Sequence, residues 1–476
     1  MPLILSGNVA SATAGVYEVA NSCRFNDGDS PRLHRTLGTA TDVDKWTFSC
    51  WFKRSTLSAT QYLFYGYASG EESAIVLKSD DTIDWYNYFS SSEQGQLVTN
   101  RKFRDVGAWY HLVCAYDSDN GTAGNRMRMY INGTEETSFA TDTNPASDEN
   151  STINKNVLHN IGMKYSDDGS GYFDGYLAEV CFVDGQQLTP SSFGEFDDDT
   201  PTVFKSIDVS GLTFGDNGAY LDFEDSDNLG DDESGNTNDW TEVNLAATDQ
   251  CTDSPTNNWC VISPLTTTNS RWTISEGNCK LANNSSGWSP ATATIGVTSG
   301  KWYCEVKCTA VGDGSVYGIM DFAQYDDGTL EMSVYSRAWI YRAATGYYHN
   351  NDAYGAGTSY GDSFTTNDII GIYLDLDNNK VYWAKNGTLQ NSGTGISITD
   401  GYDYTFAFNM YNVGGDATTY NVCEVNFGNP TWSLSSAVAD ANGYGSFEYN
   451  PSSGTFDSAS KDFYALCTKN LAEFGG

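Results

Sequence analysis

Apolar and polar residues alternate along much of the chain, and no window keeps the 3.6-residue period of an amphipathic helix. Within residues 46–53, one strand face carries Trp46, Phe48, Cys50 and Phe52. Three further runs repeat the alternation: residues 109–117, residues 126–133 with the hairpin signal Asn132-Gly133, and residues 173–190 with a turn at Asp184-Gly185. Strands joined by glycine-containing turns predict an antiparallel β-sandwich.

The same pattern returns in the second half of the chain. Residues 301–308 alternate, and residues 368–387 form two strands with turns at Asn378-Asn379 and Asn386-Gly387. The fold class is therefore predicted to be all-β, with two antiparallel jelly-roll or β-sandwich domains. The side chains expected in the two cores are Trp46, Phe48, Trp109, Leu112, Ile131, Trp302, Ile372, Leu374 and Trp383.

Changes in composition divide the chain into five parts. Residues 1–20 are predicted to be an N-terminal arm, 21–205 the first sandwich, 206–270 an acidic connector, 271–430 the second sandwich, and 431–476 a C-terminal tail. The proposed connector holds 13 acidic residues and no Lys or Arg, which favours a solvated linker. Just before its most acidic stretch, Tyr220, Leu221 and Phe223 could pair as an edge strand.

The net charge, the hydropathy and the cysteine content disfavour several classes of protein. With 62 acids against 25 bases, the net charge is −37, which disfavours nucleic-acid binding. No apolar run reaches the ~18 residues that a membrane span needs, and the N-terminus lacks the basic start of a signal peptide. The 11 cysteines are odd in number and fall within strand patterns, so we predict mostly free thiols in a protein folded in a reducing cytoplasm.

Pairs of aspartates in predicted loops are candidates for calcium. The pairs Asp27/Asp29 and Asp117/Asp119 are the main candidates, and Asp167/Asp168 and Asp375/Asp377 share the pattern. Calcium prefers several oxygen ligands from flexible loops. The alternative is that these are acidic turns facing water, and no EF-hand spacing is present. Calcium is therefore the candidate cofactor, and no other is predicted.

Aromatic and amide residues crowd one part of the second domain. Tyr347, Tyr348 and Asn350, with Trp339 and Tyr341 just before them, could stack on and hydrogen-bond to a sugar. The alternative for Trp339 and Tyr341 is that they are core residues of a strand. Residues 357–361 match G-x-S-x-G but follow a polar loop, so no catalytic residue is assigned.

Two stretches resemble known domain families. The motifs of residues 46–53, 109–117, 130–133 and 173–180 together resemble the LamG-like (concanavalin A-like) jelly roll over about residues 20–205. That family implies binding of glycans or proteins, sometimes through calcium, but Ala178-Glu179 departs from its usual Asp-Glu pair. Ser299–Tyr303 with Glu305-Val306, together with residues 368–387, resemble the SPRY family, which implies a partner-binding sandwich without chemistry of its own.

The order of these modules, the acidic stretch between them, residues 21–36 and residues 465–471 are together similar to virion structural proteins of tailed phages. This resemblance implies a non-enzymatic, external virion component that is assembled in the cytoplasm of the host bacterium. We expect a tail fibre or spike that binds a host-surface glycan or receptor, with other virion proteins as partners and a homotrimer as the favoured oligomer. The alternatives are a capsid decoration or adaptor protein without a ligand and, less favoured, a glycan-cleaving enzyme.

Overall fold

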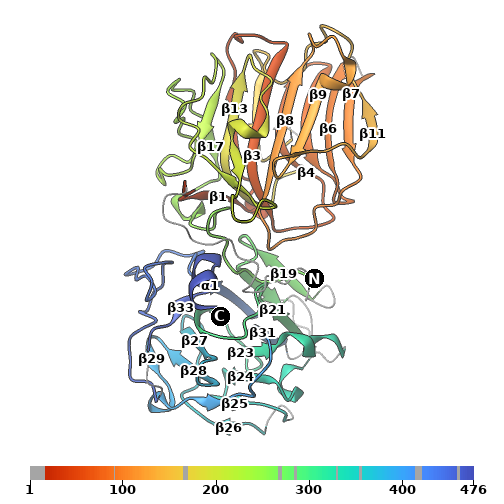
Figure 1. Ribbon diagram of the computed structural model, residues 1–476. Coiled ribbons are helices and arrows are strands. Elements are labelled where there is room, and N and C mark those ends of the chain that lie inside the picture. The colour runs from red at the N-terminus through yellow and green to blue at the C-terminus, as the bar shows by residue number, and fades with distance from the viewer. Residues whose placement is uncertain are drawn as a thin grey trace. The chain divides into compact units, whose positions relative to one another are not determined.

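The computed structural model describes residues 17–89, 92–164, 170–265, 271–283, 287–327, 331–352, 356–412, 421–457 and 461–475. These residues form two compact units, divided between Thr256 and Asn257 (Figure 1). Both units are built almost entirely from antiparallel strands, which confirms the predicted fold class. The predicted N-terminal arm lies outside the described residues except for its last positions, from Tyr17 onward.

The N-terminal unit is a sandwich of two sheets, each with eight strands among the described residues. The first sheet contains β1 (Ser22–Phe25), β3 (Lys45–Arg54), β8 (Tyr110–Asp117), β9 (Met127–Ile131), β10 (Thr134–Glu135), β13 (Gly175–Asp184), β16 (Ala219–Leu221) and β18 (Gln250–Cys251). The second contains β2 (Arg32–Thr36), β4 (Gln61–Ala68), β5 (Glu71–Leu77), β6 (Ile83–Phe89), β7 (Ser92–Thr99), β11 (Phe139–Thr143), β12 (Leu158–Ile161) and β17 (Thr241–Val243). A hairpin of β14 (Gly194–Phe196) and β15 (Phe204–Ser206) and four short 3-10 helices complete it: η2 (Asp27–Asp29), η3 (Ala123–Asn125), η4 (Pro190–Ser192) and η5 (Ala247–Asp249).

Aromatic side chains fill the space between these two sheets. Phe48 of β3 stacks on Phe64 of β4 with ring centroids 4.7 Å apart, and Trp46 meets Trp85 edge-on at 5.5 Å. Every core residue predicted in this half is buried. Trp109 belongs to a smaller cluster and donates its indole N–H to Asp253 Oδ1 at 2.9 Å. The alternation of apolar residues thus predicted the inward faces correctly.

The predicted acidic connector is instead part of the N-terminal unit up to Thr256. Its strands β16, β17 and β18 pair with β13, β2 and β1, so the suggested strand around Tyr220 and Leu221 is confirmed. Several aspartates accept hydrogen bonds from backbone N–H groups two residues ahead, which fixes turns rather than solvating a linker. At 2.9 Å, Asp222 accepts the N–H of Glu224, Asp225 that of Asp227, and Asp232 that of Ser234. The apolar residues between them are buried in the core: Leu221, Phe223, Leu229 and Trp240.

The C-terminal unit is also a two-sheet sandwich. In the described residues, its larger sheet contains β19 (Trp272–Ser275), β20 (Lys280–Asn283), β22 (Lys301–Ala310), β27 (Ile369–Asp375), β28 (Lys380–Lys385), β29 (Thr388–Leu389), β30 (Ile396–Ser397), β32 (Asn421–Asn426) and β33 (Tyr464–Ala465). The smaller contains β21 (Gly287–Thr292), β23 (Val316–Asp321), β24 (Ala338–Arg342), β25 (Tyr347–His349), β26 (Thr358–Ser359) and β31 (Tyr404–Asn412). The helical segments are η6 (Phe322–Asp327), η7 (Met332–Val334), η8 (Asn391–Gly393) and α1 (Thr468–Phe474). Trp302, Ile372, Leu374 and Trp383 are buried between the sheets, as predicted.

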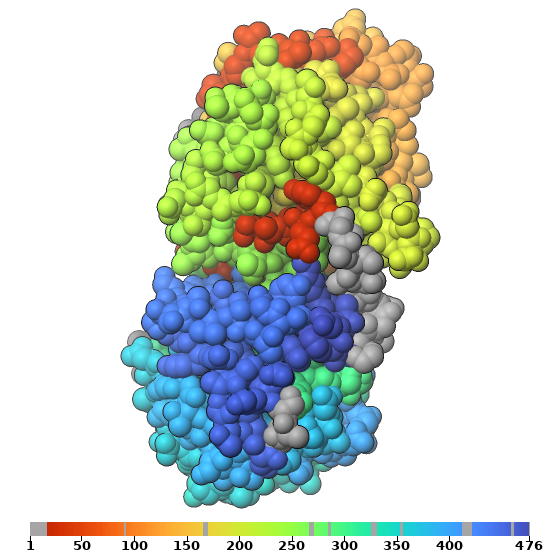
Figure 2. Space-filling view, turned by 60° about the vertical axis from the view of Figure 1, so that its left-hand side comes forward, coloured from red at the N-terminus to blue at the C-terminus, as the bar shows by residue number. Residues whose placement is uncertain are grey.

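The predicted C-terminal tail is a packed part of this unit. β33 pairs in parallel with β22, and Glu305 accepts the backbone N–H groups of Glu448 at 3.0 Å and Tyr449 at 2.8 Å. Aromatic residues of the tail are buried against the outward face of the larger sheet: Phe447, Phe456 and Phe463. Figure 2 shows this last part of the chain, in dark blue, spread over one face of the unit.

All eleven cysteines are buried and none forms a disulfide, which confirms the prediction of free thiols. Burial raises the pKa of the thiols of Cys50 and Cys304 well above the ordinary value, so they stay protonated. They act as small apolar residues of the two cores.

Candidate functional site

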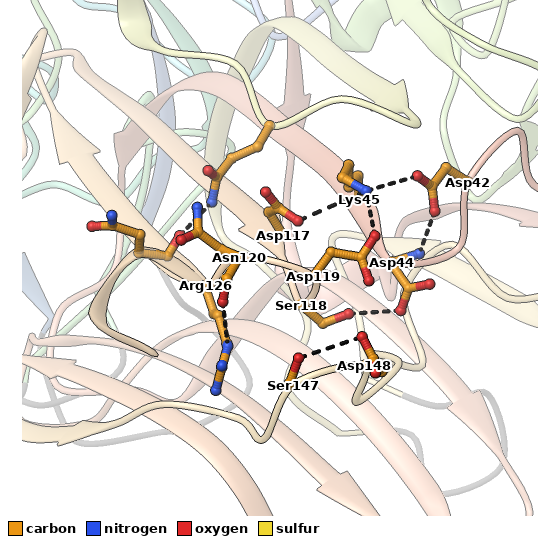
Figure 3. A network of polar contacts seen from close by, with 12 residues as sticks. Asp42, Asp44, Lys45, Asp117, Ser118, Asp119, Asn120, Arg126, Ser147 and Asp148 are labelled. Carbon is orange, nitrogen blue, oxygen red and sulfur yellow. Dashed lines mark hydrogen bonds and ion pairs between the residues drawn. The ribbon is translucent and has the colours of Figure 1, made fainter. Parts of the chain in front are cut away.

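An ammonium group occupies the centre of one predicted calcium site. Lys45 Nζ lies 2.6 Å from Asp119 Oδ2, 3.0 Å from Asp42 Oδ2 and 3.9 Å from Asp117 Oδ1 (Figure 3). The hydrogen bond to Asp119 is the main reason that the pKa of Lys45 is raised, so the ammonium stays charged. Asp44, nearby, accepts the Ser118 hydroxyl at 2.6 Å.

A calcium ion needs six to eight oxygen ligands around its own position. Here the protein supplies a cation of its own, so the site around Asp117 and Asp119 does not fit calcium. Asp27 and Asp29 lie in η2 and are exposed, and the Asn26 amide donates to Asp29 Oδ2 at 2.6 Å. Asp167 and Asp168 lie outside the described residues. Across the described ranges, no group of three or more His, Cys, Asp or Glu is arranged to hold a metal.

Two of the predicted sugar-binding aromatics are core residues. Trp339 and Tyr341 are buried in β24, and their exposed fractions are 4% and 0%. Trp339 meets Tyr404 edge-on at 5.8 Å, and the Tyr341 hydroxyl donates to the Asp362 carbonyl. Both side chains point between the sheets, where no external ligand reaches them. The core alternative is therefore correct for this pair.

The other three residues of that candidate site have mixed environments. Tyr347 is exposed, while Tyr348 is half-buried and packs edge-on against Tyr360 at 6.3 Å. The Asn350 amide donates to the carbonyls of Ser336 at 3.0 Å and Ala338 at 2.8 Å. Its N–H groups therefore fix the local backbone, which leaves Tyr347 as the most accessible member.

A different surface gathers tyrosines on the outward side of the second sheet of the N-terminal unit. Alternate residues of β4 and β6 point away from the core, whereas Phe64 and Trp85 point into it. We call this surface the tyrosine face, and it consists of Tyr62, Tyr65, Tyr67, Tyr86 and Tyr88. Its rings pack on one another: Tyr65 stacks on Tyr67 at 6.4 Å, and Tyr86 meets Tyr88 edge-on at 5.6 Å.

One row of this face crosses three strands. Tyr67 of β4 pairs with Glu72 of β5, and Glu72 pairs with Tyr88 of β6. Directly opposed residues in antiparallel strands lie on the same face of the sheet, so the carboxylate stands between two tyrosines. The Tyr65 hydroxyl donates to Glu72 Oε2 at 2.7 Å, and the Tyr86 hydroxyl donates to Oε1 at 3.3 Å.

These residues surround an open hollow with a volume of about 370 Å³, lined by Tyr67, Gly70, Glu71, Glu72 and Tyr88. Tyr88 is exposed over 37% of its surface. Glu71 at the rim pairs with Lys155, with Oε2 and Nζ 2.6 Å apart. Burial raises the pKa of the Tyr65 and Tyr86 hydroxyls, which keeps both as hydrogen-bond donors to Glu72. The hollow thus combines two tyrosine side chains with a fixed acceptor.

Sequence reasoning missed this hollow, although a signal was present. Tyrosines two positions apart, Tyr65/Tyr67 and Tyr86/Tyr88, mark one face of each strand. That signal places them on a shared face but does not tell whether the face is open.

Among the described residues, no helix has the length and apolar character needed to cross a bilayer.

Comparisons with known proteins agree with the first resemblance. Residues 27–192 match the laminin G family model described as the concanavalin A-like lectin/glucanases superfamily. Ran-binding protein 9 of Danio rerio is 30% identical over 162 residues, which make up 33% of this chain and 25% of that protein. The chain therefore spans about a quarter of the length of that curated relative.

Solved structures that are similar to parts of the chain include the SPRY domain of human HERC1. It is 20% identical, with a TM-score of 0.29, and the similarity covers 34% of this chain and 96% of that one. A heptameric SAP-like pentraxin from Limulus polyphemus is also 20% identical, with a TM-score of 0.28, covering 37% of this chain and 80% of that one.

Proposed function

We propose that the chain is a non-catalytic glycan-binding protein and that the hollow beside Tyr67, Glu72 and Tyr88 is its sugar site. The observation that carries the proposal is the row of two tyrosines flanking a fixed carboxylate in an open hollow of about 370 Å³. The apolar faces of sugar rings stack on aromatic rings, and sugar hydroxyls donate to carboxylates. The match of residues 27–192 to a family described by lectins and glucanases supports the same reading.

The size and shape of the hollow suit a short stretch of glycan. Ligand pockets commonly enclose about 300–1,000 Å³, and this hollow lies at the small end of that range. An open site of this kind holds one or two sugar units weakly. Repeating the site in an oligomer raises the effective concentration of sites, and this favours the trimer expected from the sequence.

We further propose that the protein is an external component of a tailed-phage particle, with the sugar site directed at the host surface. The resemblance in module order supports this placement, and the net charge of −37 suits an outer surface more than contact with packaged DNA. Its partners would then be other virion proteins and a host-surface glycan. A capsid decoration without a ligand is the outcome to expect if no glycan binds.

A glycan array tests the sugar site. We expect the purified protein to bind a defined set of glycans, and Tyr67→Ala/Tyr88→Ala to lose that binding while its melting temperature stays close to the wild-type value. Tyr347→Ala/Tyr348→Ala is the matched control, since it removes two tyrosines from the earlier candidate site. If this control loses binding and the first variant keeps it, the hollow is not the site.

Immuno-electron microscopy of purified particles tests the placement separately. Labelling at the tail tip or another external appendage would agree with the proposal. Absence of the protein from the particles would refute it and would leave the array result untouched.

A further inference from the structure

Glu72 is held in the hollow as an acceptor. Tyr65 and Tyr86 each donate a hydroxyl hydrogen, one to each carboxylate oxygen, at 2.7 and 3.3 Å. Because both oxygens accept, the pattern fits the ionised carboxylate, which is an acceptor at all of its lone pairs. Each oxygen keeps a further lone pair for a ligand.

The cations near the tyrosine face are engaged by groups other than Glu72, and one of them, Lys155, lies at the rim of the hollow with Glu71. Lys155 pairs with Glu71 at 2.6 Å, and Lys78 pairs with Asp84 at 3.5 Å. Lys164 lies over the Tyr62 ring, 5.9 Å from its centroid. In the part of the chain that the structure describes, no Lys, Arg or His forms an ion pair with Glu72. The carboxylate therefore presents a negative charge without an ion-pair partner among the described residues at the wall of an open hollow.

The walls of the hollow also favour a cation. Tyr67 and Tyr88 flank Glu72 on neighbouring strands, and the faces of aromatic rings attract ammonium groups. An ammonium placed at Glu72 would donate charge-assisted hydrogen bonds, which are about twice as strong as neutral ones. Hydroxyls on the same sugar ring would remain free to bond at the rim.

We infer that the hollow is selective for sugars that carry a protonated primary amine, such as unacetylated glucosamine units, with the ammonium bound by Glu72. The inference rests on the proposed sugar site and names the class of sugar that it takes. Uronic or sialic acids would place a second negative charge against Glu72, and the overall charge of −37 adds to that repulsion. An N-acetylated sugar lacks the cation.

Isothermal titration with three oligosaccharides of equal length tests the inference. The probes are a glucosamine oligomer, its fully N-acetylated form and a uronic acid oligomer, at a pH that keeps the amines charged. We expect the wild-type protein to bind the amine form about tenfold more tightly than the acetylated form and the acidic form weakest of all. This comparison uses the unmodified protein and does not depend on any variant folding.

Two Glu→Gln variants distinguish the effect of the Glu72 charge from the effect of the protein's net charge. Glu72→Gln keeps the shape and one oxygen acceptor, and we expect it to lose about tenfold in affinity for the amine oligomer and little for the acetylated one. Glu135→Gln changes the net charge equally on the other sheet of the same unit, and its affinities should match the wild type. Equal losses in the two variants would mean attraction to the whole acidic surface and would overturn the inference.

The outcomes also distinguish the inference from the proposed function. If the acetylated oligomer binds as tightly as the amine form and Tyr88→Ala abolishes both, the sugar site stands and the amine selectivity is wrong. If Tyr88→Ala leaves every affinity unchanged, the hollow is not a sugar site, and the inference fails with it.

Discussion

Both units carry tyrosines on the outward face of a sheet, but the two faces are covered to different extents. In the C-terminal unit, Tyr303, Tyr373 and Tyr382 alternate with core residues of β22, β27 and β28, and each is at most 1% exposed. In the N-terminal unit, Tyr67 is half-buried and Tyr88 is 37% exposed. The same strand pattern therefore produces a fully covered face in one unit and, in the other, a face that buries Tyr62, Tyr65 and Tyr86 but stays open beside Tyr67 and Tyr88.

The difference comes from the residues that follow β32 in the C-terminal unit, because they pack against the outward tyrosines of its larger sheet. Phe456 and Phe463 pack edge-on against Tyr373 at 5.2 and 5.0 Å, and Phe447 meets Tyr303 at 5.0 Å. The row around Glu72 instead lines an open hollow. A covered face contributes to stability, whereas an uncovered face is available for binding.

Removing a covered tyrosine is the largest expected perturbation. Tyr382→Ala should lower the free energy of unfolding of the C-terminal unit by about 3–5 kcal/mol, because it leaves a cavity among Phe456, Phe463 and the sheet. Tyr382→Phe is the control that keeps the ring and removes the hydroxyl with its hydrogen bond to Asp457 Oδ1, 2.8 Å long, and it should cost about 1 kcal/mol. Hydrogen exchange of β27 and β28 would report the loss in this unit. A cost near zero for the alanine variant would mean that the tail does not seal this face.

Two carboxylates show the same contrast, since Glu72 lies at an open hollow and Glu179 is buried. Glu179 accepts hydrogen bonds from Tyr220 at 3.0 Å and Tyr17 at 3.3 Å, as Glu72 does from Tyr65 and Tyr86, but Glu179 is buried. Burial raises its pKa from 4.5 to about 7. The folded state therefore binds a proton more tightly than the unfolded chain, and the contribution of this group to stability falls as pH rises from about 4.5 through 7.

We accordingly expect Glu179→Gln to stabilise the N-terminal unit above pH 7 by up to about 3 kcal/mol, and to change little at pH 4. Urea denaturation at several pH values, with Glu135→Gln as the exposed control, would measure the difference. If the free energy of unfolding of Glu179→Gln depends on pH as it does in the wild type, groups other than Glu179 cause that dependence.

Lys45 partly neutralises a cluster of aspartates, much as the C-terminal residues cover the outward tyrosines of the larger sheet. Because its ammonium already lies among Asp42, Asp117 and Asp119, neither calcium nor a chelator should shift the melting temperature of the wild-type protein. Lys45→Met should cost about 1 kcal/mol or less, since these ion pairs are partly exposed, and calcium should recover part of that loss. A calcium-dependent shift in the wild type would contradict our assignment of the site.

Local patterns in the sequence were sufficient for the inward faces and for hairpins such as Asn132-Gly133. They misjudged the acidic stretch because its many carboxylates suggested a solvated linker, whereas Asp225 and Asp232 each accept a backbone N–H and so fix a turn. The tail was missed for a related reason: its aromatic residues are spaced irregularly and show their role only against β22 and β28. Strand order and bends of this kind depend on contacts between distant residues.

The candidate site was harder to predict than the fold. Tyr67 and Tyr88 carry the same alternation as Tyr373 and Tyr382, and the position of Phe447, Phe456 and Phe463 distinguishes the covered face from the open one. Trp339 stayed open between a sugar-binding and a core position because aromatic density in a sequence does not tell which face of a strand a ring occupies. No local signal could have indicated that Lys45 would fill a predicted cation site.

The smallest expected effect on stability is that of Tyr88→Ala, which makes it the sharpest test of the open face. Its ring is 37% exposed and loses mainly the edge-on contact with Tyr86, so the cost should be about 0.5 kcal/mol. Tyr347→Ala, which is equally exposed, should cost a similar amount. Only Tyr88→Ala should weaken glycan binding, because stacking on that ring is lost from the hollow. Thermal denaturation and titration on the same samples would measure both effects. A cost of several kcal/mol for Tyr88→Ala would place this tyrosine in a covered face after all, like Tyr382, and would remove the contrast between the two units.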